Sequence, residues 1–136
     1  MRDRYSLAVP ARSRFARGRG LKIADLEEAS WCTPPLGSWA TALVQDLCRR
    51  FGGFEPRIDY PTDDVAMAQP LVAAGLAVAL LPALNLIQPH PGVAVRELSE
   101  APLAREIWCV QPSGRRLPAA AAMVDEVSLA ARSAGV

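Results

Sequence analysis

The sequence predicts an α/β fold, a sandwich in which helices cover a mostly parallel sheet. Strand-like and helix-like segments alternate along the chain, which is the pattern that parallel α/β sheets produce. The composition is globular, with 51% apolar and 21% charged residues. At 136 residues the chain is long enough to bury one hydrophobic core, so we expect one compact unit.

The first strand is expected at residues 4–10, where apolar and polar side chains alternate until Pro10 ends the run. A basic loop follows over 11–22, and residues 24–29 have the spacing of one or two helical turns. Residues 31–33 form a short strand that two consecutive prolines bring to an end.

The strongest helix signal begins at Ser38 and ends before Gly52. The Ser38 hydroxyl can cap the helix by accepting from free amides of the first turn, and Gly37 permits a tight turn before it. Arg49 and Arg50 fall in the last turn, where cations suit the helix dipole. Apolar residues at helical spacing define the buried face: Ala40, Leu43, Val44, Leu47, Cys48 and Phe51.

A second strand–helix unit follows. Residues 56–60 have the pattern of a strand, and Asp63 or Asp64 can cap a helix that runs to about Ala74. Pro70 lies inside this helix and removes one backbone hydrogen bond. We therefore expect a kink there, or a helix that is regular only from Pro70 onward.

Three strands and a final helix complete the pattern. The strands are expected over residues 76–82, 93–98 and 106–110. A link over 99–102 precedes the last of them, and a polar turn over 111–117 follows it. The run 76–82 is continuously apolar, as in strands covered on both faces. Pro118 opens a helix that ends near Ser133, before Gly135. Its expected buried face comprises Ala121, Val124, Val127 and Leu129 or Ala131.

The net charge is +1, but basic residues gather near the N-terminus, where only Asp3 opposes them. They are Arg2, Arg4, Arg12, Arg14, Arg17, Arg19 and Lys22. Such a segment is compatible with a nucleic-acid arm or an organelle transit peptide. Because the arginines interleave with a good strand and lack stacking aromatics, we favour solvated strand ends and a loop.

The nucleophilic and titratable residues form no recognisable catalytic or metal-binding pattern. Cys32, Cys48 and Cys109 are widely spaced on predicted apolar faces, so we expect buried free thiols. His90, the only histidine, lies in a proline-flanked turn. We therefore expect no enzymatic activity, no cofactor and no metal site.

Ligands of open α/β sheets bind beyond the carboxyl ends of strands, often at helix N-termini. The segment from Thr33 to Trp39 is one such place, because a strand ends and a capped helix begins there. Thr33 and Ser38 supply hydroxyls beside Gly37, and Trp39 can stack on an aromatic effector. The same residues also fit a helix cap without a ligand, so the residues alone leave both interpretations open.

The segment from Pro61 to Asp64 is the second candidate place, between a strand and the next helix. Thr62 can bind a ligand from the same side of the sheet, and Asp63 lies next to it. Adjacent acids at a helix start are more typical of caps than of a general acid–base pair.

Six segments, taken in order, resemble the C-terminal effector domain of LysR-type transcription regulators. They are Tyr-Ser-Leu-Ala-Val-Pro (5–10), Leu-Lys-Ile-Ala-Asp-Leu-Glu-Glu-Ala-Ser-Trp (21–31), Gly-Phe-Glu-Pro-Arg-Ile (53–58), Leu-Val-Ala-Ala-Gly-Leu-Ala-Val-Ala-Leu-Leu-Pro (71–82), Pro-Gly-Val-Ala-Val-Arg-Glu-Leu (91–98) and Leu-Ala-Arg-Glu-Ile-Trp-Cys-Val (103–110). The resemblance covers nearly the whole chain, and the stretch at 71–82 is its most specific part.

The resemblance implies a periplasmic-binding-protein-like fold, in which crossover strands join two α/β subdomains and the effector binds in the cleft between them. Carried over, residues from about 11 to 98 form one nearly complete subdomain. Residues 1–10 and 99–136 form the crossovers and part of the other subdomain. In this family the loop that matches Thr33 to Ser38 contacts effector, and the loop that matches Pro61 to Asp63 borders the cleft.

The resemblance further implies an effector-binding module of a cytoplasmic regulator, whose ligand is a small anionic molecule. DNA contact belongs to a winged helix-turn-helix that we do not find in this chain, so we expect an N-terminally truncated regulator. Full-length regulators of this kind form homo-oligomers, and no membrane partner is expected. The alternative is a periplasmic-type solute-binding protein of the same architecture, which needs an export signal.

The chain departs from the family pattern in three ways. Ala77 stands where the family often has glycine, and Pro70 interrupts a helix that is usually unbroken. The first half of the first subdomain, which supplies the other cleft wall, is also missing. We therefore expect the returning strand and the last helix to expose apolar faces.

Overall fold

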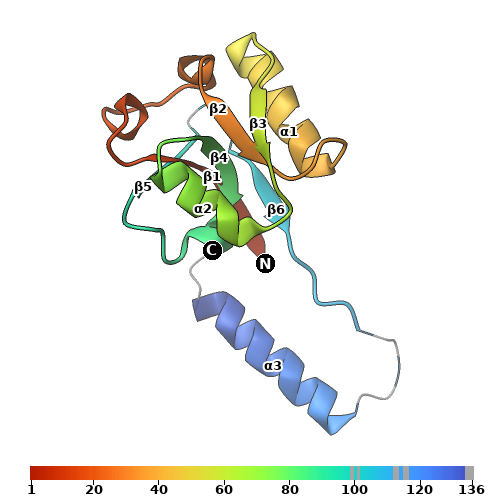
Figure 1. Cartoon of the computed structure of the whole chain (residues 1–136). Helices are drawn as coiled ribbons and strands as arrows, with labels where there is room; N and C mark the ends of the chain where they lie inside the picture. The colour runs from red at the N-terminus through yellow and green to blue at the C-terminus, as the bar shows by residue number, and fades with distance from the viewer. Residues whose placement is uncertain (99, 101, 112–113, 115–116, 134–136) are drawn as a thin grey trace.

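The protein, seen in a computed structural model that describes residues 1–98, 100, 102–111, 114 and 117–133, is an α/β structure (Figure 1). The described strands form a six-stranded sheet in the order β3-β2-β4-β1-β5, and β6 pairs with β1. The strands are β1 (Arg2–Pro10), β2 (Ser30–Thr33), β3 (Arg57–Pro61), β4 (Val78–Pro82), β5 (Val93–Arg96) and β6 (Ala104–Glu106). The α-helices are α1 (Trp39–Leu47), α2 (Val65–Ala73) and α3 (Pro118–Ser133).

The sheet is mixed, so the expectation of a mostly parallel sheet is wrong. β2 pairs in parallel with β3 and β4, but β1 runs antiparallel to β4, β5 and β6. A crossover helix makes two strands parallel, and α1 and α2 supply such crossovers between β2, β3 and β4. The connections over 11–29 and 83–92 contain short 3-10 turns and no α-helix. They therefore do not force the strands that they join to run parallel.

Helices cover both faces of the sheet, which confirms the predicted sandwich. Side chains alternate along β1: Leu7 and Val9 pack in one buried cluster with Val44 of α1. Ala8 points to the opposite face and packs with Val72 of α2. The core therefore lies in two layers, one on each side of the sheet.

The two predicted crossover helices are present, with small differences at their ends. The helix expected from Ser38 consists of α1 and a π-helical turn over Cys48–Gly52, which ends at Gly53 with φ +75°. Helix α2 begins at Val65 and continues through Pro70, so a helix that is regular only from Pro70 onward is wrong. Pro70 is exposed, so the missing amide leaves no unpaired group in the core.

The strand expected over 106–110 is also wrong, because β6 ends at Glu106. Its partner strand, β1, begins at Arg2. Two further backbone hydrogen bonds join Ile107 and Met1: the Ile107 N–H donates to the Met1 carbonyl over 2.8 Å, and the Met1 amino group donates to the Ile107 carbonyl over 2.9 Å. Beyond Ile107 the described chain makes no further pairing with β1. Cys109 is therefore exposed, and not buried as the sequence suggested.

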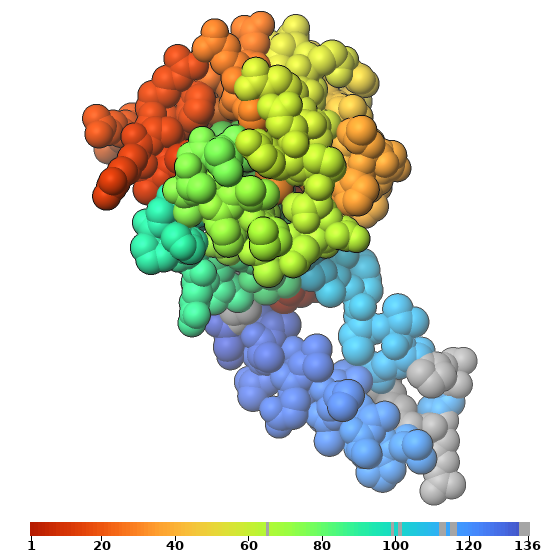
Figure 2. Space-filling view, viewed as in Figure 1, coloured from red at the N-terminus to blue at the C-terminus, as the bar shows by residue number. Residues whose placement is uncertain are grey.

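Helix α3 spans the predicted residues but has no buried face. None of its residues from Pro118 to Ser133 is buried, so the buried face expected from Ala121 to Ala131 is wrong. The helix projects from the rest of the molecule (Figure 2). The exposed apolar faces expected here are present, in Ile107, Trp108, Val110, Leu117, Met123, Val127 and Leu129.

Three expectations involve residues outside the described set: the link at 99–102, the polar turn at 111–117 and the stop at Gly135. Among the helices built from described residues, none combines the length and the apolar character needed to cross a membrane.

The burial of two cysteines predicts a large spread in thiol reactivity. Cys48 is fully buried, and burial raises the pKa of its thiol to about 12, so about one molecule in ten thousand carries the reactive thiolate at pH 8. Burial also raises the pKa of Cys32. We expect one fast-reacting thiol, Cys109, in a titration with a chromogenic disulfide reagent at pH 8. Cys109→Ser should remove the fast phase and Cys48→Ser should not; three equal rates would contradict the fold.

Candidate functional site

The two predicted ligand-binding loops lie at one edge of the sheet, where three parallel strands end. Since β2 pairs in parallel with β3 and β4, Thr33, Pro61 and Pro82 finish their strands at the same edge. The Thr62 N–H donates to the Thr33 carbonyl over 2.8 Å. This backbone bond joins the loops that the sequence identified separately, so they form one continuous wall.

The first loop is held by hydrogen bonds between its own residues. The Ser38 hydroxyl accepts from the Thr41 N–H over 3.2 Å, which confirms the predicted N-cap of α1, and donates to the Thr41 hydroxyl over 3.0 Å. The Pro34 carbonyl accepts from the hydroxyls of Thr41 over 2.6 Å and Thr33 over 2.9 Å. Gly37 turns the chain with φ +87°, in the region that favours glycine. The loop therefore presents α1 in a fixed orientation.

The second loop is organised around Asp64. Its carboxylate accepts from the Ala66 N–H over 2.9 Å, so Asp64, and not Asp63, caps α2. The Thr62 hydroxyl accepts from the Asp64 N–H over 3.2 Å. Asp63 is exposed. The N-termini of α1 and α2 thus both border this edge of the sheet.

A hollow of about 200 Å³ lies between these loops and the N-terminal part of β1, and we call it the carboxyl-edge hollow. Of the residues predicted from the sequence, Thr33, Trp39 and Thr62 line it. Gly37, Ser38 and Asp63 do not line it. The remaining lining residues are Tyr5, Cys32, Pro34, Ala40, Leu43, Val44, Asp64, Ala68, Leu80, Leu81, Pro82, Asn85 and Arg105.

Sequence reasoning missed the cation that lines this hollow, Arg105, and the buried carboxylate that holds it, Asp3. These residues lie directly opposite each other on β1 and β6. Asp3 is fully buried, and its Oδ2 accepts from Nε of Arg105 over 2.9 Å and lies 2.8 Å from Nη2. The other oxygen of Asp3 accepts from the Leu84 N–H over 3.2 Å. A buried carboxylate of this kind requires such partners, so Asp3 fixes the position of Arg105.

Burial raises the pKa of two other ionisable groups that line the hollow, Tyr5 and Cys32. Burial raises the pKa of Tyr5, and this outweighs the positive charge of Arg105, which lowers it. Burial also raises the pKa of the Cys32 thiol. At neutral pH both groups carry their protons, so the charges on the lining are those of Arg105 and Asp64.

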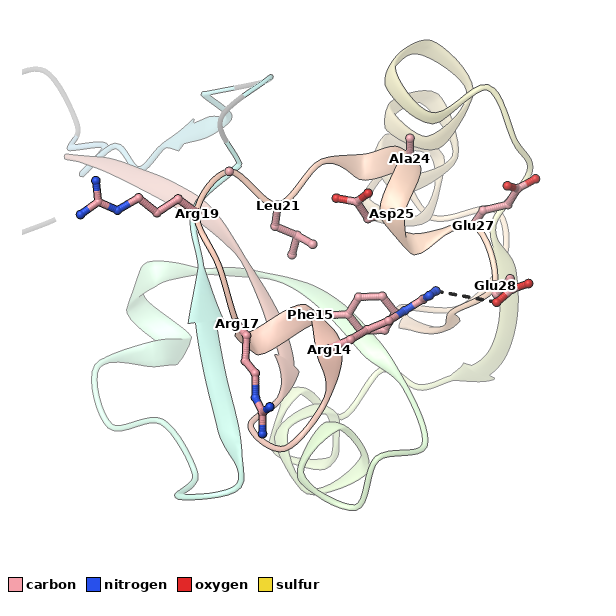
Figure 3. Close-up of a pocket in the computed structure, with 10 residues that line it drawn as sticks. Arg14, Phe15, Arg17, Arg19, Leu21, Ala24, Asp25, Glu27 and Glu28 are labelled. Carbon is pink, nitrogen blue, oxygen red and sulfur yellow. Dashed lines mark ion pairs between the residues drawn. The ribbon is translucent and has the colours of Figure 1, made fainter.

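A second hollow lies beside the basic loop, on another part of the molecule (Figure 3). Its lining carries both signs of charge, because acidic residues such as Asp25 and Glu28 line it together with the loop arginines. Arg14 lies 3.7 Å from Glu28 and 5.1 Å above the Phe15 ring, while Arg17 points away from this pair. Opposed, exposed charges do not favour one kind of ligand, so this hollow is not our candidate site.

The basic loop is itself fastened to the sheet. The Arg96 guanidinium donates to the carbonyls of Ala16 over 3.1 Å and Gly18 over 2.7 Å. Ser13 donates to the Pro10 carbonyl over 2.7 Å. These bonds agree with the structural interpretation of the basic segment that the sequence favoured.

The model of the LysR substrate binding domain family matches residues 1–131. The match covers nearly the whole chain, so the protein belongs to this family of regulator domains.

A relative and two solved structures illustrate the similarity. The transcriptional dual regulator GltC of Bacillus subtilis (strain 168) is 27% identical over 114 residues, which cover 83% of this chain and 37% of GltC. The chain thus spans about a third of that relative's length. The Synechocystis PCC6803 CcmR regulatory domain in complex with 2-PG matches with a TM-score of 0.75 and 16% identity, over 93% of this chain and 62% of that chain.

The effector binding domain of QuiR in complex with shikimate matches with a TM-score of 0.65 and 16% identity, over 91% of this chain and 59% of that chain. At this identity the two structures support the fold alone, which is the periplasmic-binding-protein-like fold that the resemblance implied. Together with the family match, they do not favour the alternative of a periplasmic-type solute-binding protein.

Loss of the Ser38 cap should destabilise the chain. Ser38→Ala removes the hydroxyl that pairs with the Thr41 amide and should lower the free energy of unfolding by about 1 kcal/mol. Ser38→Asp, the matched control, retains a capping oxygen and should keep most of the stability. Urea denaturation measures both, and an unchanged midpoint in Ser38→Ala would contradict the cap.

The two halves of the Asp3–Arg105 pair should contribute unequally to stability. Arg105→Ala leaves a fully buried carboxylate without its cation and should cost about 3 kcal/mol of unfolding free energy. Asp3→Ala leaves a guanidinium side chain that is already 36% exposed, so the cost should be smaller. Thermal and urea unfolding of the two variants test this order; equal losses would argue against it.

Proposed function

We propose that this chain binds a small anionic effector in the carboxyl-edge hollow, and that this binding controls transcription in a regulator of the LysR type. The observation that carries the proposal is the convergence of both predicted loops on one hollow in a chain of the LysR substrate binding domain family. The position fits the general rule that open α/β sheets bind ligands beyond the carboxyl ends of their strands.

The size and the charge of the hollow support a small acid as the ligand. A volume of about 200 Å³ is smaller than the sites that hold drug-sized molecules, which begin at roughly 300 Å³. The N-termini of α1 and α2 border it, and helix N-termini favour negative charge. The CcmR and QuiR domains are described with 2-PG and shikimate, which are small acids.

The predicted site residues take two kinds of role in this proposal. Thr33, Trp39 and Thr62 line the hollow and contact the effector. Gly37, Ser38 and Asp63 lie outside the lining and act through the two loops that carry the contacts. Ser38 does so most directly, because both hydrogen bonds of its hydroxyl go to Thr41.

The regulatory step is a shift between conformations. Effector that binds one arrangement of the two subdomains more tightly increases the population of that arrangement. In the full-length regulator this changes how a homo-oligomer holds DNA through helix-turn-helix domains, which lie outside the match to residues 1–131. The chain itself binds its ligand without converting it, and it acts in the cytoplasm.

Binding should be visible at Trp39. Its indole is 65% exposed at the hollow, Trp31 is buried in the core, and Trp108 is exposed beyond β6. A titration of the ¹⁵N-labelled chain with a panel of small acids, including 2-PG and shikimate, should move the Trp39 indole signal saturably. The Trp31 and Trp108 signals serve as internal controls and should stay in place.

Thr62→Val removes a hydroxyl from the hollow and keeps the side-chain volume, so it should weaken binding about fivefold. Ser13→Ala, which removes a hydroxyl from the distant basic loop, should leave the affinity unchanged. If no acid in the panel moves the Trp39 signal, or if both variants weaken binding equally, the hollow is not the effector site.

A further inference from the structure

Arg105 has a place in the carboxyl-edge hollow that the loops do not explain. It enters from β6, which pairs with β1 outside the strand path from β3 to β5, and it lines the hollow together with Tyr5. Its partner Asp3 is fully buried, while 36% of the Arg105 side chain is accessible. The pair therefore has a closed side, at Asp3, and an open side, at the hollow.

The geometry of the pair leaves donors of Arg105 for a second partner. A guanidinium has five N–H groups arranged as a fork, and it can hold oxyanions at more than one edge. Asp3 Oδ2 occupies the edge formed by Nε and Nη2, at 2.9 and 2.8 Å. The Nη1 donors take no part in these contacts. Because Asp3 is the cross-strand partner of Arg105, the backbone register and the ion pair fix the guanidinium together.

We infer that Arg105 binds the carboxylate or phosphate of the effector, and that Asp3 is the residue that positions it. The inference rests on the proposed function, because it names the group that recognises the ligand's charge. A neutral ligand would displace water from the Arg105 donors without offering them a charged acceptor in its place. The hollow therefore discriminates against uncharged analogues. The carboxylates of Asp3 and Asp64 are themselves held by the Leu84 and Ala66 amides, which reduces their repulsion of an incoming anion.

The direct test follows the Nε–Hε signal of Arg105 in the ¹⁵N-labelled chain, assigned by its loss in Arg105→Lys. Three probes separate the ligand chemistries: shikimate as a carboxylate, its methyl ester as the neutral analogue, and inorganic phosphate. We expect shikimate, phosphate or both to shift the signal saturably, according to whether the subsite takes carboxylate, phosphate or either. The methyl ester should bind about tenfold more weakly than the acid, or weaker still, since it lacks a charge-assisted hydrogen bond.

Variants then separate recognition from folding. Arg105→Gln alone leaves Asp3 buried without a cation, so the double variant Asp3→Asn with Arg105→Gln replaces the pair by two neutral amides. In this double variant the preference for shikimate over its ester should disappear. Asp3→Asn alone keeps the guanidinium but loosens it, and should reduce the preference without abolishing it. Arg4→Gln removes an exposed charge from the neighbouring position and should leave the preference unchanged.

Two results would overturn the inference. One is an acid preference that persists in the double variant, and the other is an Arg105 signal that none of the anionic probes moves at the highest soluble concentration. If a ligand moves the Trp39 signal while Arg105 is unaffected, the proposed function stands and this inference alone is rejected. The ratio of acid to ester affinity is the decisive readout, because a loss of stability alone would weaken both ligands equally.

Discussion

The pairing of β1 with three other strands is the constraint on which the rest of the structure depends. Residues 5–8 pair with β4, residues 7–10 with β5 and residues 2–4 with β6. A strand of nine residues spans roughly 30 Å, which is long enough to hold partners in succession along its length. Each described strand outside the β2–β3–β4 unit is therefore attached to the sheet through β1.

The same pairing produces the candidate site. The parallel unit brings the ends of β2, β3 and β4 to one edge, and the Thr62–Thr33 backbone bond closes the two loops there. β1 runs in the opposite direction, so its first residues, and not its last, reach that edge. This places Tyr5, and Arg105 on the paired β6, beside the loops. The hollow therefore combines helix N-termini from the parallel unit with a cation from β6.

The sequence predicts most of the local structure because local chemistry determines it. Ser38 caps α1, Pro118 opens α3, and the apolar run before Pro82 is a central strand. The antiparallel direction of β1 could not be predicted in this way. It depends on connections that contain no α-helix, and the spacing of apolar residues does not show which way such connections turn the chain. The buried face expected for α3 failed for a related reason, since an amphipathic pattern shows that a helix can pack, and not that the described residues supply its partner. Half of the predicted site residues line the hollow.

Arg105 escaped prediction because its role depends on register. The strands predicted from the sequence began at residue 4 and at residue 106. Asp3 and Arg105 therefore each lay one residue before a predicted strand. One or two residues at a strand end are within the ordinary uncertainty of boundaries, yet here they hold the ion pair. A pair of opposite charges on two strands that are distant in sequence gives no signal in a single sequence, because the two residues lie about a hundred positions apart.

The central position of β1 has a consequence for how the chain is made. β1 is synthesised before its neighbour β4, which begins only at Val78. Until then Leu7, Ala8 and Val9, which are completely buried in the finished sheet, have no partner strand. The β2–α1–β3–α2–β4 segment is continuous and can assemble from neighbouring pieces first. A nascent chain of this protein therefore carries an unpaired apolar strand until β4 has been made, and this is the stage at which we expect a holding chaperone to matter most.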